Sequence, residues 1–248
     1  MFPHLGPEHS EGLECPSCGS IARERVVYEA ILRQFDGSVS AAPIVRNSNL
    51  KAYTVLEFSP RSYTTRLPLY SSAFKEYVAS DFDESAHRTD VKIDLLDPET
   101  YAGLLGKFDI IICSHVLEHI PDYHHAIGGL SSLLSPTGKL FFQVPILEGH
   151  YTPITWDEFH GDHTRAYHRF GFDLAEKFLP LFPSIALYLG LREFEITSRE
   201  IKLTKYDSLQ QGNLGIEIVE FGGEVMDAKG LGCPDLCEVF VLSRKNEP

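Results

Sequence analysis

Two histidines and a serine follow a predicted buried strand near the middle of the 248-residue chain. The strand is the apolar run Ile110–Cys113, which is rich in β-branched residues and typical of parallel strands covered on both faces. Ser114 and His115 stand where it ends, and His119 lies four positions further, on the same face of a helical turn. Because histidine accepts protons near neutral pH, His115 and His119 are candidates for a general base. Alternatively, His119 serves the fold by ordering Glu118 or a loop carbonyl.

Acidic residues stand at the ends of three further predicted strands. Glu57 follows the apolar run that begins at Tyr53, Asp81 ends Glu76–Asp81, and Asp94 ends Val91–Asp94. A strand-end carboxylate accepts two hydroxyl donors at once, which suits the recognition of ribose. The separation of Glu57 and Asp81 is close to the roughly 20 residues that are typical of nucleotide-binding α/β sheets. These acids predict a ligand that contains a nucleoside.

A long loop at residues 145–172 is rich in polar aromatic residues and histidines, which indicates a functional segment rather than a simple connection. We expect it to cover the acceptor substrate, and His150 is a loop-borne alternative for the base. The candidate substrate contacts in this loop are Tyr151, Trp156, His163 and Arg165. Alternatively, a hydrogen-bond network pins the loop, with Arg165 paired to Asp162 or Asp157.

The order of the remaining patterns predicts an α/β fold. Ile21–Phe35 has helical spacing, and Phe108–Val144 is a strand–helix–strand unit. The alternating runs Phe194–Ile201 and Val239–Leu242 predict an antiparallel hairpin at the C-terminal edge of a mostly parallel, seven-stranded sheet with helices on both faces. We expect an N-terminal arm with a CxxC motif and a helix over residues 1–50, followed by a catalytic domain over 51–248.

The pieces FDIIICSHVLEHIPD and LSSLLSPTGKLFFQVP resemble the fourth and fifth strands of class I S-adenosylmethionine-dependent methyltransferases. In that family a strand with a polar tip is followed by VLEH and then by a proline- and glycine-containing turn before the next strand. The resemblance covers Val55–Pro145. CPSCGSIARER near the N-terminus and GDHTRAY in the long loop also resemble a subgroup with CPxCGS and DHxRxY segments. The resemblance implies a Rossmann-like fold and S-adenosylmethionine as cofactor.

The same resemblance implies a set of cofactor contacts at the strand ends. Asp94 and Leu95 match the pair that holds the adenine amino group. The chain departs from the family after Glu57, where serine and proline replace a glycine-rich turn that approaches the cofactor closely. The implied contacts are Glu57, Phe58, Ser59, Pro60, Asp81, Asp94, Leu95, Ser114 and His115.

Two functions from different classes follow. The first is O-methylation of a small-molecule or sugar hydroxyl, with Mg²⁺ at the substrate site as a further expectation, held by Asp157 or Asp162. The second is a catalytically inactive binding or scaffold protein, motivated by the missing glycines after Glu57.

A hydride-transferring enzyme is disfavoured because no G-x-G-x-x-G follows any strand. A zinc-protease site is also disfavoured, because HExxH needs glutamate directly after its first histidine, unlike His115 and Glu118.

The composition limits the partners. A formal net charge of −13 and the lack of a basic run argue against nucleic-acid binding. No signal pattern and no apolar run of membrane-spanning length is present, so we expect a cytoplasmic protein without membrane contact. The expected partner is a small-molecule or sugar substrate, and a homodimer is the expected assembly.

Two cysteine pairs form a separate candidate site. Cys15 and Cys18 have the spacing of a zinc knuckle, which supplies two of the four ligands of a structural zinc ion. Cys233 and Cys237 can complete a tetrahedral site, and His4 or His9 are other completing ligands. Alternatively, the pair at Cys15 consists of free thiols at a turn.

A zinc ion shared by Cys15, Cys18, Cys233 and Cys237 predicts about one metal ion per chain in elemental analysis of the purified protein. A strong chelator is then expected to lower the melting temperature, because structural metal binding is coupled to folding. Metal-free protein with unchanged stability would show that the thiols are not ligands.

Overall fold

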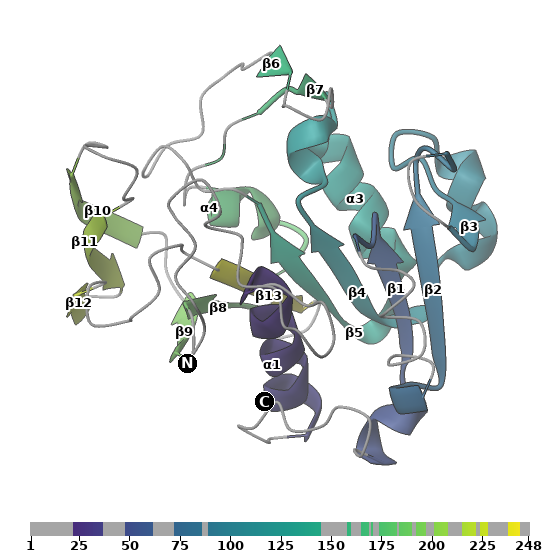
Figure 1. Cartoon of the computed structure of the whole chain (residues 1–248), viewed down its shortest axis with the longest axis horizontal. Coiled ribbons are helices and arrows are strands. Elements are labelled where there is room, and N and C mark those ends of the chain that lie inside the picture. Colours follow the sequence, from purple (N-terminus) through teal and green to yellow (C-terminus); the bar gives the residue numbers. More distant parts are fainter. Residues whose placement is uncertain are drawn as a thin grey trace.

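The computed structural model describes residues 22–36, 48–61, 72–85, 89–144, 158–159, 165–168, 170, 174–182, 184–189, 192–196, 201–207, 215–221, 224–227 and 238–243. Its central feature is an eight-stranded sheet with the order β3-β2-β1-β4-β5-β13-β8-β9 (Figure 1). The strands from β3 to β5 pair in parallel. The strands β13, β8 and β9 extend the sheet by antiparallel pairing.

The parallel part confirms the predicted series of strands. Its members are β1 (Thr54–Phe58), β2 (Glu76–Asp81), β3 (Val91–Lys92), β4 (Phe108–Ser114) and β5 (Leu134–Gln143). The antiparallel members are β8 (Ser184–Leu189), β9 (Arg192–Ile196) and β13 (Glu238–Ser243). All four long parallel strands end at the same edge of the sheet, which brings the residues that follow them together (Figure 1).

Helices cover both faces of the sheet, as expected. One face packs against α1 (Ala22–Asp36) and the 3-10 helix η3 (Ser48–Ala52). The other packs against α3 (Tyr123–Leu133), α4 (Leu174–Phe178) and the 3-10 helix η4 (Pro98–Leu104). Along β4, Ile110 and Ile112 join the first cluster, whereas Ile111 and Cys113 join the second. This alternation explains the unbroken apolar run, since both faces of the strand are buried.

Side-chain caps define where the helices near β4 begin. Asp97 accepts a hydrogen bond from the Glu99 N–H at the start of η4, where Pro98 occupies a position that needs no donor. The Asp122 carboxylate accepts from the His125 N–H at 3.0 Å and begins α3. Pro121 lies between the short 3-10 helix η5 (Leu117–His119) and this cap, so η5 and α3 are separate helices.

The antiparallel edge is confirmed, but its strands differ from the expected hairpin and the sheet has eight strands instead of seven. β8 lies between β13 and β9, so β13 pairs with β5 and β8 and not with β9. β8 has the sequence SIALYL, a short apolar run that contains an alternating pattern. β8 and β9 form the antiparallel pair at this edge because a short connection joins them in sequence.

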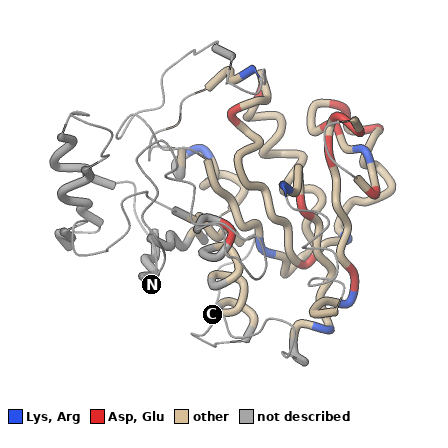
Figure 2. The backbone as a smooth tube through the Cα atoms, in the orientation of Figure 1, with Lys and Arg blue, Asp and Glu red and all other residues tan. Residues whose placement is uncertain are grey.

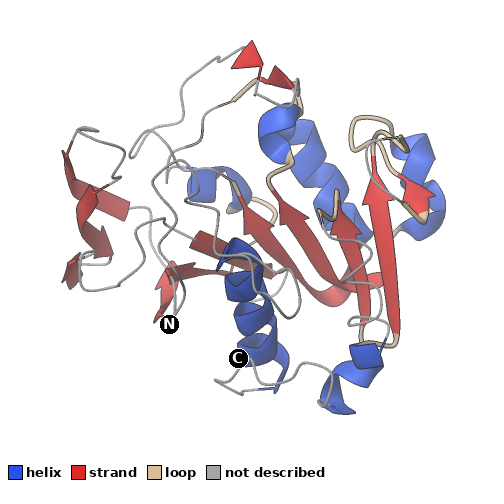
Figure 3. Cartoon of the chain, viewed as in Figure 1, coloured by secondary structure: helices blue, strands red, loops and turns tan. Residues whose placement is uncertain are grey.

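Shorter elements lie outside the main sheet (Figure 3). A two-stranded ladder joins β6 (Glu158–Phe159) to β7 (Arg165–Ala166) within the predicted substrate loop. A separate three-stranded sheet contains β10 (Ile201–Asp207), β11 (Gly215–Phe221) and β12 (Glu224–Asp227). Among the described helices, none has the length and apolar character that a bilayer crossing requires.

Two glycines near β4 provide a matched test of this packing. A Cβ atom at Gly138 would lie 2.7 Å from the Phe108 carbonyl oxygen, whereas one at Gly128 in α3 meets nothing within 4 Å. We expect Gly138→Ala to lower the free energy of unfolding by about 1–3 kcal/mol through overpacking. Gly128→Ala is expected to raise it by about 0.5–1 kcal/mol, since alanine favours the helix. Urea unfolding measures both, and a Gly138→Ala variant as stable as the wild type would contradict the packing.

Candidate active site

The strand order reverses between β1 and β4. From β1 the chain continues outward to β2 and β3, whereas from β4 it continues in the other direction to β5. Ligands of open α/β sheets bind outside the carboxyl ends of the strands at such a switch point. Phe58 and Cys113 are register partners at the ends of β1 and β4, so Ser59 and Ser114 leave the sheet side by side.

Both strand tips at the switch point have an unusual backbone conformation. Within the described residues, Ser59 (φ 46°) and His115 (φ 56°) are the non-glycine residues with positive φ. The left-handed region costs a residue with a Cβ atom about 1–2 kcal/mol. Ser59 therefore keeps the backbone conformation for which glycine is usually needed. Strain of this kind concentrates at functional sites, where the surrounding structure maintains it.

Hydrogen bonds to neighbouring strands hold these two tips. The Ser59 N–H donates to the Ser80 carbonyl oxygen at 2.7 Å, and the His115 N–H donates to the Gln143 carbonyl oxygen at 2.9 Å. The Ser114 hydroxyl donates to Oε1 of Gln143 at 2.8 Å. Gln143 is buried at the end of β5. The tip of β4 is thus fixed to β5 through both backbone and side chain.

The η5 turn brings a carboxylate next to the two candidate histidines. Oε1 of Glu118 lies 3.4 Å from Nδ1 of His115 and 4.0 Å from Nε2 of His119. The Glu118 side chain is buried, whereas about a quarter of each histidine side chain is exposed. His115 and His119, which the sequence predicted to lie together, are therefore brought together around Glu118.

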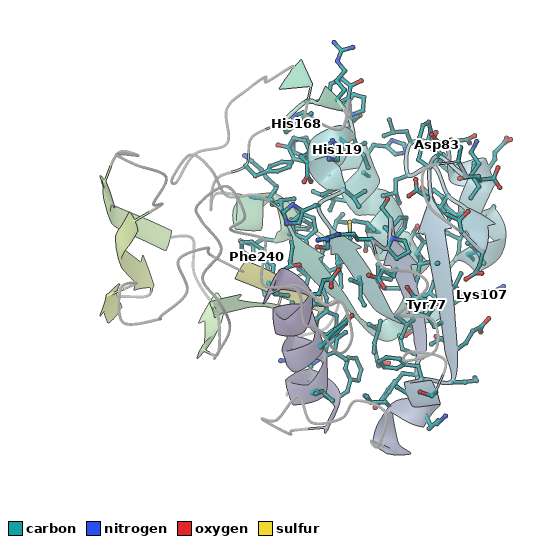
Figure 4. All side chains as sticks on the ribbon, in the orientation of Figure 1. Tyr77, Asp83, Lys107, His119, His168 and Phe240 are labelled. Carbon is teal, nitrogen blue, oxygen red and sulfur yellow. The ribbon has the colours of Figure 1, made fainter. Side chains whose placement is uncertain are left out.

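The segment from Arg165 to His168, at the end of the predicted substrate loop, is docked on η5. The Tyr167 N–H donates to the Glu118 carbonyl oxygen at 2.7 Å. Nδ1 of His119 donates to the Arg165 carbonyl oxygen at 2.9 Å, so this nitrogen carries the proton. Nε2 of His168 donates to the carbonyl oxygens of Ile120 and Pro121. Figure 4 shows His119 and His168 close together near the start of α3.

The aromatic ring of Tyr123 reinforces this docking. It contacts the rings of His168 and Phe170 edge to face, with centroid distances of 4.8 and 5.3 Å. The guanidinium of Arg165 lies over the ring of Tyr167, 5.1 Å from its centroid, and Arg165 is exposed. This part of the loop is therefore held beside the β4 tip by backbone and histidine contacts. The predicted pairing of Arg165 with Asp157 or Asp162 involves acids that lie outside the described residues.

Glu57 lies within the sheet and not at its edge. The residue follows Val55 on the face covered by α1, and its carboxylate accepts a hydrogen bond from the Tyr77 hydroxyl at 2.7 Å. Only 2% of Glu57 is exposed. Tyr77 lies along β2, away from the tip of that strand (Figure 4). The pair satisfies a buried carboxylate between β1 and β2, and the predicted contact of Glu57 with the cofactor stays a prediction.

The carboxylates at the end of β2 and after β3 are held by backbone turns. Oδ1 of Asp81 accepts from the Asp83 N–H at 2.9 Å, and Oδ1 of Asp94 accepts from the Leu96 N–H at 2.8 Å. Phe82, directly after Asp81, is 63% exposed. Acidic residues gather around this corner of the sheet (Figure 2). They include Asp81, Asp83, Glu84, Asp90, Asp94, Asp97 and Glu99.

The buried thiol at the end of β4 is not a nucleophile. Burial raises the pKa of Cys113 far above its usual value, and the charge of Glu118 raises it further. Since the thiolate is the reactive form, Cys113 stays an inert thiol near neutral pH.

An open groove of about 500 Å³ between η4 and α3 is lined by residues that include Tyr101, Leu105 and His124. None of the strand-tip residues lines it, so this groove is separate from the switch point.

The predicted site residues divide into two groups. The structure brings Ser59, Pro60, Ser114, His115 and His119 to the carboxyl edge, with Asp81, Asp94 and Leu95 after the neighbouring strands, and it buries Phe58 in the core. The predicted site residues that lie outside the described part of the chain are His150, Tyr151, Trp156, His163, Cys15, Cys18, Cys233 and Cys237, together with the alternative metal ligands His4, His9, Asp157 and Asp162. Within the described residues no group of three or more potential ligands can hold a metal ion.

Four residues at or near the edge were not predicted as site residues. Glu118 was considered only as a side chain that His119 orders, and Gln143 is a buried polar residue inside an apolar strand. Phe82 could have been found from the sequence, because it is a large aromatic residue directly after the strand-end acid Asp81. His168 left no distinctive pattern, because its partners are carbonyl groups far away in the sequence.

The strand order, the antiparallel edge and the polar strand tips define a Rossmann-like fold of the class I methyltransferase type. A family model described as a methyltransferase domain matches residues 26–194. The chain therefore belongs to this methyltransferase family. Enzymes of the class use S-adenosylmethionine as methyl donor, and the family model confirms that part of the resemblance found in the sequence.

Individual known proteins are similar over shorter stretches or at low identity. The ubiquinone biosynthesis O-methyltransferase of Coxiella burnetii is 50% identical over 36 residues, which are 14% of this chain and 15% of that protein. The protein of the same description from Xanthomonas axonopodis pv. citri is 38% identical over 58 residues, 23% of this chain and 24% of that protein. The chain thus spans less than a quarter of the length of these relatives.

A solved structure matches over nearly the whole chain. The 1,6-didemethyltoxoflavin-N1-methyltransferase of Burkholderia thailandensis, with bound 1,6-didemethyltoxoflavin and S-adenosylhomocysteine, is 11% identical with a TM-score of 0.44. The match covers 99% of this chain and 93% of that one.

Proposed function

We propose that the protein transfers the methyl group of S-adenosylmethionine to a hydroxyl group of a small molecule. The observation that carries this proposal is the pair of left-handed strand tips at Ser59 and His115, which flank the switch point of the sheet. His115, with about a quarter of its side chain exposed, lies beside the expected methyl position. It supports a hydroxyl acceptor, because a hydroxyl group benefits from a general base. The relatives described as O-methyltransferases support the same acceptor class.

Three residues at the acidic corner of the sheet, Asp81, Phe82 and Asp94, suit the nucleoside part of the cofactor. Asp81 is oriented by the Asp83 N–H and is suited to accept hydrogen bonds from both ribose hydroxyls. Phe82 offers an exposed aromatic face next to this carboxylate, against which a planar base can stack. Asp94 and Leu95 are the candidates for contact with the adenine edge. Ser59 and Pro60 form the turn that approaches the methionine part.

The cofactor supplies an electrophilic methyl group on a positively charged sulfur atom. The role of the protein is to align the acceptor oxygen with this methyl group, which alone is worth roughly 7–11 kcal/mol. We assign the general base to His115 and not to His119. Nδ1 of His119 donates to the Arg165 carbonyl oxygen and Nε2 faces Glu118, so both ring nitrogens are directed at the protein and His119 anchors the loop. His150 remains a candidate base from the loop.

The acceptor is proposed to bind between the β4 tip and the loop of residues 145–172. The docked end of this loop lies against η5, which supports a binding wall next to His115. Tyr151, Trp156, His163 and Arg165 are the proposed contacts, and a sugar or another ring-containing hydroxyl compound is the proposed substrate class. Membership in the CPxCGS subgroup, a zinc ion at the cysteine pairs and Mg²⁺ at the substrate site belong to the same proposal.

The alternative of an inactive scaffold depended on the missing glycines after Glu57. Ser59 adopts φ 46°, the conformation that glycine usually provides, so the substitution has not removed the turn. This observation favours a retained cofactor site. Isothermal titration with S-adenosylmethionine separates the two functions, because an inactive scaffold without a cofactor site gives no heat and no thermal shift.

Asp81→Ala removes the proposed ribose acceptor. We expect the dissociation constant for S-adenosylmethionine to rise at least tenfold, since charge-assisted hydrogen bonds contribute about 1.5–3 kcal/mol each. Glu99→Ala, which removes an exposed carboxylate on η4, is the matched control and should bind normally. An Asp81→Ala variant with wild-type affinity and wild-type folding would contradict the assignment of this carboxylate.

Methyl transfer itself is tested with labelled S-adenosylmethionine and three probe acceptors: phenol, catechol and a methyl glycoside. On any probe that is methylated, His115→Ala should lower kcat by about 10²–10⁴-fold and leave cofactor affinity nearly intact. His119→Ala, His150→Ala and His163→Ala belong to the same series, and His125→Ala, at an exposed position at the start of α3, is the control. If all variants keep kcat within about threefold, the reaction needs no histidine base and proceeds by alignment alone or through a metal-activated hydroxyl held by Asp157 or Asp162.

A further inference from the structure

Glu118 combines deep burial with an incomplete set of hydrogen bonds. The residue is 3% exposed. Among the residues that the structure describes, its Oε2 is the buried side-chain oxygen without a hydrogen-bond partner. Burying a carboxylate is costly unless neighbouring groups compensate its charge. The ring nitrogens nearest to the other oxygen, Oε1, are Nδ1 of His115 and Nε2 of His119.

The Glu118 side chain is not needed to dock the loop. Its backbone carbonyl oxygen already accepts hydrogen bonds from the N–H groups of Tyr167 and His168, at 2.7 and 3.4 Å. His119 adds its own contact with the Arg165 carbonyl oxygen. The docking of the 165–168 segment is therefore complete without the carboxylate. A different reason is required for a buried charge at this position.

The two histidines present different nitrogen atoms to Glu118. His119 faces it with Nε2 at 4.0 Å, while Nδ1 of the same ring is engaged with the loop. His115 faces it with Nδ1 at 3.4 Å. This distance is longer than the roughly 2.7–3.2 Å of a formed hydrogen bond, but contacts of catalytic groups often shorten only when substrate binds. Since a carboxylate only accepts, a contact at Nδ1 requires the proton on that nitrogen and leaves Nε2 as the basic atom.

We propose that Glu118 is a positioning residue that holds His115 with the proton on Nδ1 and stabilises its imidazolium during methyl transfer. The inference rests on the proposed function for its kinetic consequence. In the step, the acceptor oxygen forms a bond to the methyl carbon, and the sulfur keeps the electron pair of the broken bond and becomes neutral. The hydroxyl proton moves to Nε2 of His115. The resulting positive ring then lies next to the buried negative charge of Glu118, which is worth more in a desolvated site than in water.

The first test needs no acceptor and is made on the wild-type protein, with one variant used only to assign the signals. In protein labelled with nitrogen-15 at histidine, long-range proton–nitrogen spectra report which ring nitrogen of His115 carries the proton when the ring is neutral. The signals are assigned with His115→Gln. We expect Nδ1 to carry the proton in the wild type. A His115 ring with the proton predominantly on Nε2 would overturn the proposal, whatever the enzyme methylates.

Two variants separate the proton position from the charge. Glu118→Gln keeps an acceptor oxygen, so His115 should keep the proton on Nδ1 and lose only the neighbouring charge. Glu118→Met has a similar length and no acceptor, so His115 should lose this preference as well. On a methylated probe, we expect kcat to fall by at least about tenfold in Glu118→Met, with KM and cofactor affinity within about threefold. Glu99→Met on the surface of η4 is the matched control.

A double-mutant cycle distinguishes action through His115 from a general structural role. If Glu118 acts through His115, Glu118→Met should change kcat less than about twofold in a His115→Ala background. Equal effects in both backgrounds, or unchanged kcat in the single variant, would overturn the proposal while leaving methyl transfer intact. Absence of methylation on every probe would contradict the hydroxyl acceptor, and the proton position of His115 would still decide the role of Glu118.

Discussion

The burial of β4 on both faces is the constraint on which the rest of the structure depends. Its side chains alternate between the cluster under α1 and the cluster under α3, while β1 and β5 pair with its two edges. A shift by one residue would exchange every side chain between the two faces, so the register is strongly fixed. Because the register is fixed, the position of every residue that follows the strand is fixed as well. Ser114 and His115 thus leave the sheet at one defined point.

The left-handed turns at Ser59 and His115 are consequences of this rigid frame. Each costs backbone energy, and each is held by a hydrogen bond to the neighbouring strand. The two turns follow β1 and β4, the strands between which the strand order reverses. A site built on such tips is more rigid than one built on loops, which suits a reaction that depends on alignment. The left-handed residues thus lie at the same two strand ends that form the switch point.

The carboxylates of the site have different tasks because their surroundings differ. Glu57 is satisfied inside the sheet by the Tyr77 hydroxyl, whereas Asp81 is oriented at the edge by the backbone of a turn. Glu118 is buried next to imidazole rings. Their residue types are similar, and what distinguishes them is the partner of each carboxylate in the folded protein.

The sequence by itself determined the α/β fold, the series of parallel strands and the edge at which polar residues gather. These features follow from local rules, since a doubly buried strand needs an unbroken apolar run and a helix needs caps such as Asp97 and Asp122. It also singled out His115 and His119, because polar residues at a buried strand end are unusual. The family model supports the class of fold that these patterns predicted.

Only the tertiary structure decided which of these residues touch one another. The insertion of β8 between β13 and β9, the docking of Arg165–His168 on η5 and the bond between Tyr77 and Glu57 join residues that are distant in sequence. No local pattern encodes such pairs, because their free energy comes from excluding water between elements that meet after folding. For the same reason, His115 and His119 were equivalent in the sequence and differ in the structure, where His119 is bonded to the loop and His115 faces Glu118 through Nδ1.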